Sequence, residues 1–508
     1  MFVRKKKNKS GSVSIQIIDK TDGKYRVIST VGSSKDENKI NHLINNAIQL
    51  IPKLHNQTTI EFGYSRRDRA ILDFVKYNKS LRIYTVGPEL VLGKIFNTLG
   101  FNTIKENLFK QIVVARLVYP TSKLKTVDYI MRHRGVKISV QRVYDFLDRL
   151  NKKHKETVER ISYENTKRIL KTISVVFYDM TTLYFEAEDE DDLRKIGFSK
   201  DGKFQKPQIM LGLLVGENGY PIGYDIFEGN IFEGYTLLLT LKKIQKKYNF
   251  TQPIVVADAG LLSKDNLKKL GEQEYKFILG GRIKNENDKV KSEILKKSQN
   301  MKDGDSFTIE KEDGIRLIVT YSDKRAKKDE YNRKKGLRKL EIRVKTGKLT
   351  KNSINNRGYN KFLTLSGNIK VSINEEKIKV DKLWDGLKGY ITNTKLTSDK
   401  VVGHYSHLWQ IEKAFRISKT DLRIRPVYHY KKRRIEAHIC ICFVAYVIWK
   451  ELERLLTKNE IDLSPQKAIE LLKTIYEARF VLPDSNKEER ALINLSVVQK
   501  LLLKVSGS

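Results

Sequence analysis

The sequence predicts an α/β protein with a mixed β-sheet at its centre. From Ile173 onward, short apolar runs rich in β-branched residues alternate with longer amphipathic segments, the pattern of strands and helices in a layered domain. The chain has 508 residues, of which 40% are hydrophobic, so several domains with sizeable cores can form. A formal net charge of +38 favours nucleic acid as the partner; a basic surface that only aids solubility is the alternative.

Two regions are expected before this domain. Residues 1–60 combine strand-like runs with a helical pattern and predict a small β/α unit. Residues 61–170 are mostly helical in pattern, with Arg and Lys on the polar faces, and predict a helical DNA-binding region. Within it, Val140–Leu150 directs Arg142 and Arg149 outward and is a candidate DNA-contacting helix. A structural helix with a solvated basic face explains this pattern equally well.

Residues 171–281 show the element order β-β-β-α-β-α-β. The expected strands are Ile173–Phe185, Pro207–Val215, Pro221–Phe227, Pro253–Asp258 and Tyr275–Gly280, and the expected helices are Tyr235–Tyr248 and Ser263–Leu270. This order is the layout of the ribonuclease H-like fold, whose core is a mixed five-stranded sheet with flanking helices. That core places one carboxylate on the first strand, one just after the fourth, and one on a helix beyond the fifth.

The pattern breaks after the fifth strand. Residues 282–380 are rich in Lys and Glu, with strand-like pieces around a charged helix, and predict a β-rich insertion subdomain. The core is expected to resume over residues 381–456, with a strand at Leu387–Thr392 and a helix from about Asp399 through Thr420. A long buried helix follows, and residues 457–508 predict a C-terminal helical region.

Three carboxylates fall at the positions that such a fold uses. Asp179 lies in the middle of an apolar strand, where a charge is costly to bury unless a metal or partner needs it. Asp258 ends a short apolar strand and is followed by Ala259-Gly260; a turn aspartate is the alternative. Glu412 lies on the predicted helix, where a surface ion pair with Arg416 is the alternative.

A polar line accompanies Glu412 on that helix. Tyr405, Glu412 and Lys419 are spaced seven apart, about two helical turns, so they are expected to share a face, which Arg416 joins. Two hard cations roughly 3.5–4 Å apart serve both oxygens of an in-line displacement at phosphorus. Mg²⁺ prefers oxygen ligands, so the three carboxylates predict a site for two Mg²⁺ or Mn²⁺ ions. Tyr405, Arg416 and Lys419 are then expected to hold phosphates nearby.

These motifs resemble the bacterial insertion-sequence transposases of the DDE class, in the branch with a Y-x2-R-x3-E-x6-K pattern. Here the pattern reads Tyr405, Leu408, Glu412 and Lys419, so leucine fills the Arg position and Arg416 is the candidate to supply its charge. Asp179-Met180-Thr181 and Asp258-Ala259-Gly260 resemble the D-x-T and D-x-G blocks of the family. The resemblance runs from about residue 100 to 450 and extends more weakly to Arg116–Leu124 and Trp384–Gly386.

The resemblance implies a cut-and-paste DNA transposase. Such an enzyme recognises the terminal inverted repeats of its element in double-stranded DNA, cuts the element ends and joins them to target DNA, as a homodimer or larger assembly on paired ends. A ribonuclease H-like nuclease that cuts without joining, and a non-catalytic DNA-binding protein derived from a transposase, are the alternatives.

Smaller signals concern DNA, membranes and the compartment. The run Lys431-Lys432-Arg433-Arg434 is expected to contact the DNA backbone, with a solvated helix end as the alternative. The longest apolar run, Ile439–Trp449, is far shorter than the roughly 20 residues that span a bilayer, so no membrane association is expected. Cys440 and Cys442 lie inside this run and are expected to be small core residues in a reducing compartment. The resemblance to bacterial transposases implies that this compartment is the bacterial cytoplasm, with association with the nucleoid during function.

Overall fold

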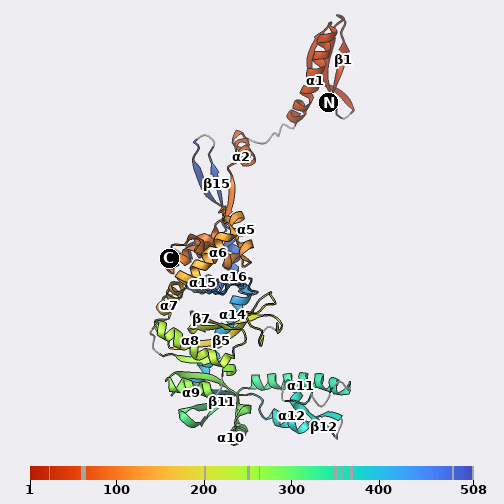
Figure 1. Ribbon diagram of the computed structural model, residues 1–508. Helices are drawn as coiled ribbons and strands as arrows, with labels where there is room; N and C mark the ends of the chain where they lie inside the picture. Colours follow the sequence, from red (N-terminus) through yellow and green to blue (C-terminus); the bar gives the residue numbers. More distant parts are fainter. Residues whose placement is uncertain are drawn as a thin grey trace. The chain divides into compact units, whose positions relative to one another are not determined.

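The computed structural model describes residues 1–505, apart from 22, 59–64, 200–201, 249–251, 262–263, 347–348, 350–352, 356–357, 367–369 and 483–484 (Figure 1). The chain divides into two compact units. The first unit comprises residues 1–82 and 479–489, and the second comprises residues 83–478 and 490–508. Every residue predicted to take part in catalysis or phosphate binding belongs to the second unit.

The first unit begins with a three-stranded antiparallel sheet covered by a helix. The alternation of β2 turns Ile15 and Ile17 inward, where they pack against Ile40 and Ala47 of α1. Helix α2 starts with a capping box, in which Ser65 and Asp68 satisfy each other's backbone N–H groups. The elements are β1 (Phe2–Lys7), β2 (Val13–Thr21), β3 (Lys24–Ser34), α1 (Glu37–Thr58) and α2 (Arg66–Tyr77).

The second unit opens with a helical bundle built around one long buried helix. Helix α15 packs against α3, α4, α6, α7 and α16, and α17 packs against α16. These helices are α3 (Lys94–Thr98), α4 (Asn107–Val118), α5 (Lys123–Arg134), α6 (Val140–Arg149), α7 (Lys155–Leu170), α15 (Lys432–Lys458), α16 (Pro465–Leu472) and α17 (Val497–Val505). Cys440 and Cys442 are unpaired and buried in α15, as predicted. Among the described helices, none is long and apolar enough to cross a membrane.

A mixed eight-stranded sheet follows, in the order β10-β11-β14-β9-β8-β5-β6-β7. Strands β5, β8 and β9 are parallel, and the other neighbouring pairs are antiparallel. The strands are β5 (Val175–Tyr184), β6 (Gln208–Val215), β7 (Pro221–Glu228), β8 (Ile254–Ala257), β9 (Lys276–Gly281), β10 (Ser306–Glu310), β11 (Arg316–Tyr321) and β14 (Leu387–Thr392). The α/β class with a mixed sheet is confirmed, but the expected size of five strands is wrong, because β14, β11 and β10 continue the sheet beyond β9. A separate three-stranded sheet has the order β16-β15-β4, formed by β4 (Arg82–Thr85), β15 (Tyr476–Val481) and β16 (Glu488–Ile493).

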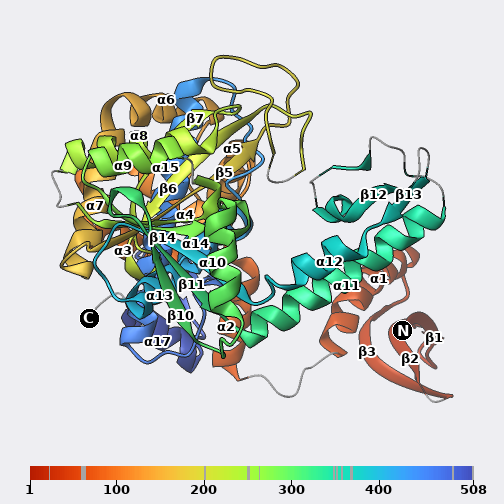
Figure 2. The same cartoon turned by 90° about the horizontal axis from the view of Figure 1, so that it is seen from below.

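The two faces of the main sheet are covered by different helices. Val176 and Tyr178 of β5 share a core with α8, which packs beside α9 (Figure 2). Phe177 belongs instead to the core that includes α14 and α15. Strand residues two apart point to the same face, so Asp179 lies on the face that α14 covers. The helices named here are α8 (Glu233–Tyr248), α9 (Lys264–Glu272) and α14 (Trp409–Arg416).

The segment predicted as a β-rich insertion differs from that expectation. Its first two strands, β10 and β11, belong to the main sheet. The rest of its described residues are mainly helical, because the Lys- and Glu-rich sequence consists of good helix formers. A small core of Leu340, Phe362, Leu363 and Val371 holds the residues after β11 together, whereas Ile294 belongs to a core of the main sheet. Its elements are α10 (Asp288–Ser298), α11 (Asp323–Lys345), β12 (Leu363–Ser366), β13 (Lys370–Ile373) and α12 (Glu375–Lys382).

Candidate active site

Asp179 and Asp258 lie side by side on neighbouring parallel strands. Strands β5 and β8 are in register with Tyr178 opposite Ala257, and each aspartate is the next residue along its chain. Neighbouring strands are about 4.8 Å apart, so the two backbones are this close at Tyr178 and Ala257, directly before the aspartates. Asp179 is half-buried and Asp258 is exposed just beyond the end of β8. The sheet therefore brings together two acids that lie far apart in the sequence.

Tyr405 is tied directly to Asp258. Its hydroxyl donates a hydrogen bond to Asp258 Oδ1 at 3.1 Å, and the N–H of Ala259 donates to the same oxygen at 2.7 Å. Burial, reinforced by the charge of Asp258, raises the pKa of Tyr405 well above its usual range, so the phenol remains a neutral donor. A Cβ on Gly280 of β9 would lie 2.6 Å from the Tyr405 oxygen, so the contact depends on glycine at that position.

The expected single helix around Glu412 is divided into three pieces. These are α13 (Ser398–Ser406), α14, and a π-helical turn, η10 (Ile417–Asp421). The prediction that Tyr405, Glu412 and Lys419 lie on one continuous helix is wrong, because α13 ends at Ser406 and a wider π turn begins at Ile417. Glu412 is exposed on α14, which packs against β5, and Arg416 lies one turn further along the same helix.

Lys388 of β14 interacts electrostatically with both Asp258 and Glu412. Its ammonium lies 4.4 Å from the Tyr405 ring centroid and 5.2 Å from that of Tyr390. Burial and the neighbouring Arg325 lower the pKa of Lys388, while the negative charges of Asp258 and Glu412 oppose this shift. Lys388 was not among the residues predicted from the sequence, although a lysine inside the buried strand LKGYIT was an available signal.

The donor set has the chemistry that a hard divalent cation requires. Asp179, Asp258 and Glu412 offer only carboxylate oxygens, the ligands that Mg²⁺ prefers. Asp179 and Asp258 are already adjacent. Across the described residues, however, no three His, Cys, Asp or Glu side chains are close enough together to hold a metal ion. Binding an ion at all three carboxylates therefore requires these side chains to move closer together.

The family model described as the transposase DDE domain matches residues 170–448, more than half of the chain. The chain belongs to the transposase DDE domain family. The matched segment of this family member runs from the last residue of α7 into α15 and contains Asp179, Asp258 and Glu412. The resemblance to bacterial insertion-sequence DDE transposases that the motifs predicted is therefore confirmed.

One curated relative is the transposase for insertion sequence element IS1151 of Clostridium perfringens. It is 24% identical over 255 residues, which cover 43% of this chain and 46% of the relative. The chain thus aligns with about half the length of this relative.

Two solved structures show weaker likeness. The synaptic complex of piggyBac transposase with hairpin DNA is 10% identical, with a TM-score of 0.39, covering 76% of this chain and 78% of that chain. The Mos1 transposase paired-end complex with the left transposon end is 12% identical, with a TM-score of 0.16, covering 31% of this chain and 53% of that chain. TM-scores this low do not establish a shared fold, so membership of the family rests on the sequence match.

The basic residues predicted to bind DNA occupy two places in this DDE domain. Arg416 is exposed at the end of α14, and Lys419 is half-buried in η10. The run Lys431-Lys432-Arg433-Arg434 lies at the start of α15. The Nε atoms of Arg433 and Arg434 both lie 2.9 Å from Asp148 of α6, and hydrogen bonds from these guanidinium groups lower the pKa of Asp148 to about 2. Lys431 and Lys432 are exposed, and no ion pair joins them to another described residue.

Other basic residues are also engaged within the helical bundle. Arg149, a candidate DNA contact on α6, instead makes a two-pronged hydrogen bond with Glu106, at 2.7 and 3.0 Å. The N-cap of α6 is Ser139, whose hydroxyl accepts the N–H of Arg142 at 3.2 Å. The structural interpretation of α6 therefore accounts for Arg149, whereas Arg142 is exposed.

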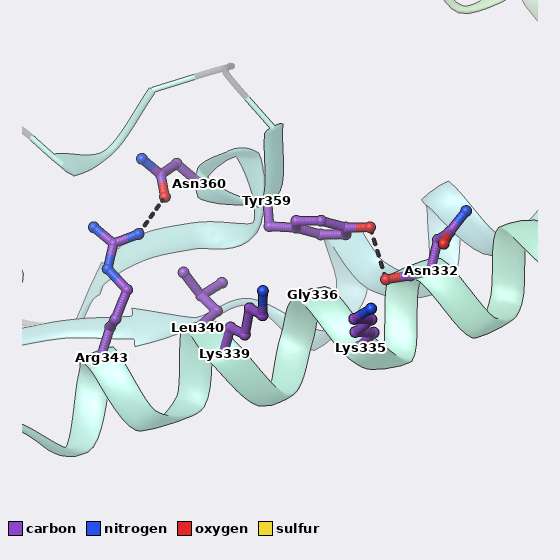
Figure 3. A pocket seen from close by; sticks show the side chains of 8 residues that line it. All are labelled: Asn332, Lys335, Gly336, Lys339, Leu340, Arg343, Tyr359 and Asn360. Atoms are coloured by element: carbon purple, nitrogen blue, oxygen red, sulfur yellow. Dashed lines mark hydrogen bonds between the residues drawn. The ribbon is translucent and has the colours of Figure 1, made fainter. Parts of the chain in front are cut away.

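A cleft of about 380 Å³ lies elsewhere in the second unit, between α11 and the segment before β12 (Figure 3). None of the candidate carboxylates lines it. Lys335, Lys339 and Arg343 line its α11 side at four-residue spacing, and the hydroxyl of Tyr359 donates to the Asn332 carbonyl at 2.7 Å. Three of its described lining residues are basic and none is acidic, so the cleft is unsuited to holding a cation.

Proposed function

We propose that this protein is a DNA transposase whose catalytic core has the ribonuclease H-like fold. The run β7-β6-β5-β8-β9 supports this fold, because its first three strands are antiparallel and the next two are parallel to β5. The observation that carries the proposal is the alignment of Asp179 with Asp258 on adjacent strands of a domain that belongs to the DDE family. The chain would cut DNA at the ends of its element and join those ends to target DNA.

Asp179, Asp258 and Glu412 would hold two Mg²⁺ or Mn²⁺ ions. Bound there, the ions would activate the attacking oxygen and stabilise the leaving oxygen of an in-line displacement. The side chains around them have separate tasks. The Tyr405 hydroxyl fixes the orientation of the Asp258 carboxylate through its 3.1 Å hydrogen bond. Lys388 offsets the mutual repulsion of Asp258 and Glu412 before the ions arrive.

The basic residues around this centre would position the DNA. Arg416 and Lys419 follow Glu412 along the chain and would contact phosphates next to the scissile bond. Lys431 and Lys432 would contact the backbone further away, together with Arg433 and Arg434 to the extent that Asp148 leaves their charges free. The overall charge of +38 favours such contacts.

The remaining expectations about partners and organisation complete the proposal. The protein would act on double-stranded DNA that carries terminal inverted repeats, as a homodimer on paired ends, in the bacterial cytoplasm. Residues 61–170 would contribute DNA binding. The proposed core comprises residues 171–281 and 381–456, and residues 282–380 supply two further strands of the sheet, β10 and β11, and the α11 region.

The test compares wild type with Asp179→Asn on duplexes that carry the element ends, with Mg²⁺ or Mn²⁺. We expect wild type to produce cleaved ends and strand-transfer products, and the variant to lose at least about 100-fold in rate, as when one electrostatic contact to the reacting centre is removed. Asp225→Asn is the matched control, because Asp225 is a half-buried aspartate of the same sheet that pairs with Lys243. Cleavage without joining would favour a nuclease, and equal activity of the two variants would contradict the proposal.

A further inference from the structure

Four basic side chains are buried together in the helical bundle of the second unit. Arg116 of α4, Lys123 at the first position of α5, His429, and His438 of α15 are 5%, 4%, 8% and 5% exposed. The Lys123 ammonium lies 3.5 Å from His438 Nδ1, and the His429 and His438 rings are 5.6 Å apart. We call these four residues the buried basic cluster. It unites positions that are more than 300 residues apart in the sequence.

No acid balances this cluster among the described residues. Neither Arg116 nor Lys123 forms an ion pair with a described carboxylate, and the charge of Arg116 repels those of Lys123, His429 and His438. Asp148 attracts His429, but it is already bound by two arginines of α15. Burying like charges without a counter-charge is strongly unfavourable, so a cluster of this kind calls for an anion.

The cluster has the donors and the access that an oxyanion needs. No described residue forms a hydrogen bond or ion pair with the Arg116 guanidinium. Its nitrogen atoms are not sealed from solvent, so they can donate to a ligand. Lys123 opens the 12-residue helix α5, whose N-terminus adds partial positive charge. In the sequence, His429 lies between Tyr428 and Tyr430, which are 59% and 63% exposed, so the segment that carries it runs along the surface.

We propose that the buried basic cluster binds a phosphate oxyanion. The planar fork of Arg116 and the ammonium of Lys123 are the two cationic donors, and the imidazole of His429 adds a polar N–H group. His438 holds Lys123 in place instead, because its Nε2 bonds to the Ile424 carbonyl at 3.0 Å and its Nδ1 faces the Lys123 ammonium. The phosphate comes either from the DNA backbone, in which case the site anchors the DNA of the proposed transposase, or from free inorganic phosphate.

The protonation behaviour of Lys123 agrees with a ligand of this charge. Burial, with repulsion from Arg116 second, lowers the pKa of Lys123 to about 7. A phosphate beside it raises this pKa and keeps the ammonium charged near neutral pH. The same burial lowers the pKa of His438, which without an anion stays neutral.

The first experiment needs neither catalysis nor DNA, so its outcome is independent of the proposed function. Thermal unfolding of the full-length protein is followed in inorganic phosphate and in sodium chloride of equal ionic strength. We expect a saturable rise of Tm in phosphate that chloride does not produce. The rise should disappear in Lys123→Met and persist in Lys125→Met, which removes the same charge from an exposed position on the same helix.

A second measurement identifies the source of the phosphate. Binding of a random-sequence DNA duplex is measured against salt concentration without divalent ions. If the DNA backbone occupies the site, the magnitude of the slope of log K against log salt falls by about 0.9 in Lys123→Met. Inorganic phosphate then competes with DNA. If free phosphate is the ligand, only the thermal shift depends on Lys123.

Several results would overturn the proposal. One is the absence of both a phosphate-specific shift in wild type and a difference in salt slope between Lys123→Met and Lys125→Met. Another is a phosphate shift that survives in both Lys123→Met and Arg116→Met, because the anion would then bind elsewhere. Circular dichroism verifies that each variant folds, and Arg116→Met provides the second test if Lys123→Met does not.

Discussion

Replacing Gly280 with alanine tests whether the geometry around Asp258 matters for activity. The added Cβ would lie 2.6 Å from the Tyr405 oxygen, whereas ordinary contacts begin near 3.4 Å, so the hydroxyl has to move by about 0.8 Å. Its 3.1 Å hydrogen bond to Asp258 then exceeds hydrogen-bonding length if the movement is directed away from the carboxylate. A hydrogen bond to a charged group contributes about 1.5–3 kcal/mol, and a displacement of about 1 Å at a reacting centre costs on the order of 100-fold in rate.

The assay is metal-dependent DNA cleavage, with thermal unfolding measured in parallel. We expect Gly280→Ala to lose about 10- to 100-fold in cleavage rate and about 1–3 kcal/mol in stability from overpacking. Gly403→Ala is the matched control, because Gly403 lies on the same helix as Tyr405 and an added Cβ there meets nothing within 4 Å. In a Tyr405→Phe background the clashing oxygen is absent, so adding Gly280→Ala should reduce the cleavage rate and the stability by less. An equal cost in both backgrounds, or wild-type cleavage by Gly280→Ala, would refute this reasoning.

Three further predictions concern other charges and contacts. Lys388→Met removes a cation that competes with metal at Asp258, so Mn²⁺ binding measured by calorimetry should tighten by up to about fivefold, the equivalent of one partly exposed ion pair; weaker binding would contradict this. Gly336→Ala places a Cβ 2.2 Å from the Tyr359 ring, and should destabilise the α11 region by about 1–3 kcal/mol and speed its hydrogen exchange; unchanged exchange would count against the packing described. The pKa of Lys123 is lowered to about 7 from 10.5, so the unfolded chain binds more protons between these values and stability rises with pH there. Denaturant unfolding at a series of pH values should show the free energy of unfolding rising by about 1.4 kcal/mol per pH unit in this range, and Lys123→Met should remove this rise. An equal rise in the variant would refute the prediction.

The strands of the core could be predicted because their signals are local. Apolar runs bounded by Gly, Pro and Asn gave β5 to β9 to within a few residues, and β14 was predicted at Leu387–Thr392, the bounds that the structure has. The break between α13 and α14 could not be predicted. His407 and Leu408 carry no helix-breaking signal, and the apolar pattern continues across them. The two helices meet different strands, since α13 packs against β9 and α14 against β5 and β6.

The sequence by itself determined the chemistry that the protein carries. It contains a large positive charge, the three carboxylates that we propose as metal ligands, and a basic run before a buried helix. These features can be recognised because charge, periodicity and motif spacing are properties of neighbouring residues along the chain.

Only the tertiary structure decided which of these groups meet. The register of β5 against β8 aligns Asp179 with Asp258, and the packing of α13 on β9 brings the Tyr405 hydroxyl to the second aspartate. The position of Lys388 beside Tyr405 and the assembly of the buried basic cluster also depend on the tertiary structure. The physical reason is that strand register and helix packing are set by the burial of whole faces, and such long-range pairings leave no signal in the local pattern of the sequence.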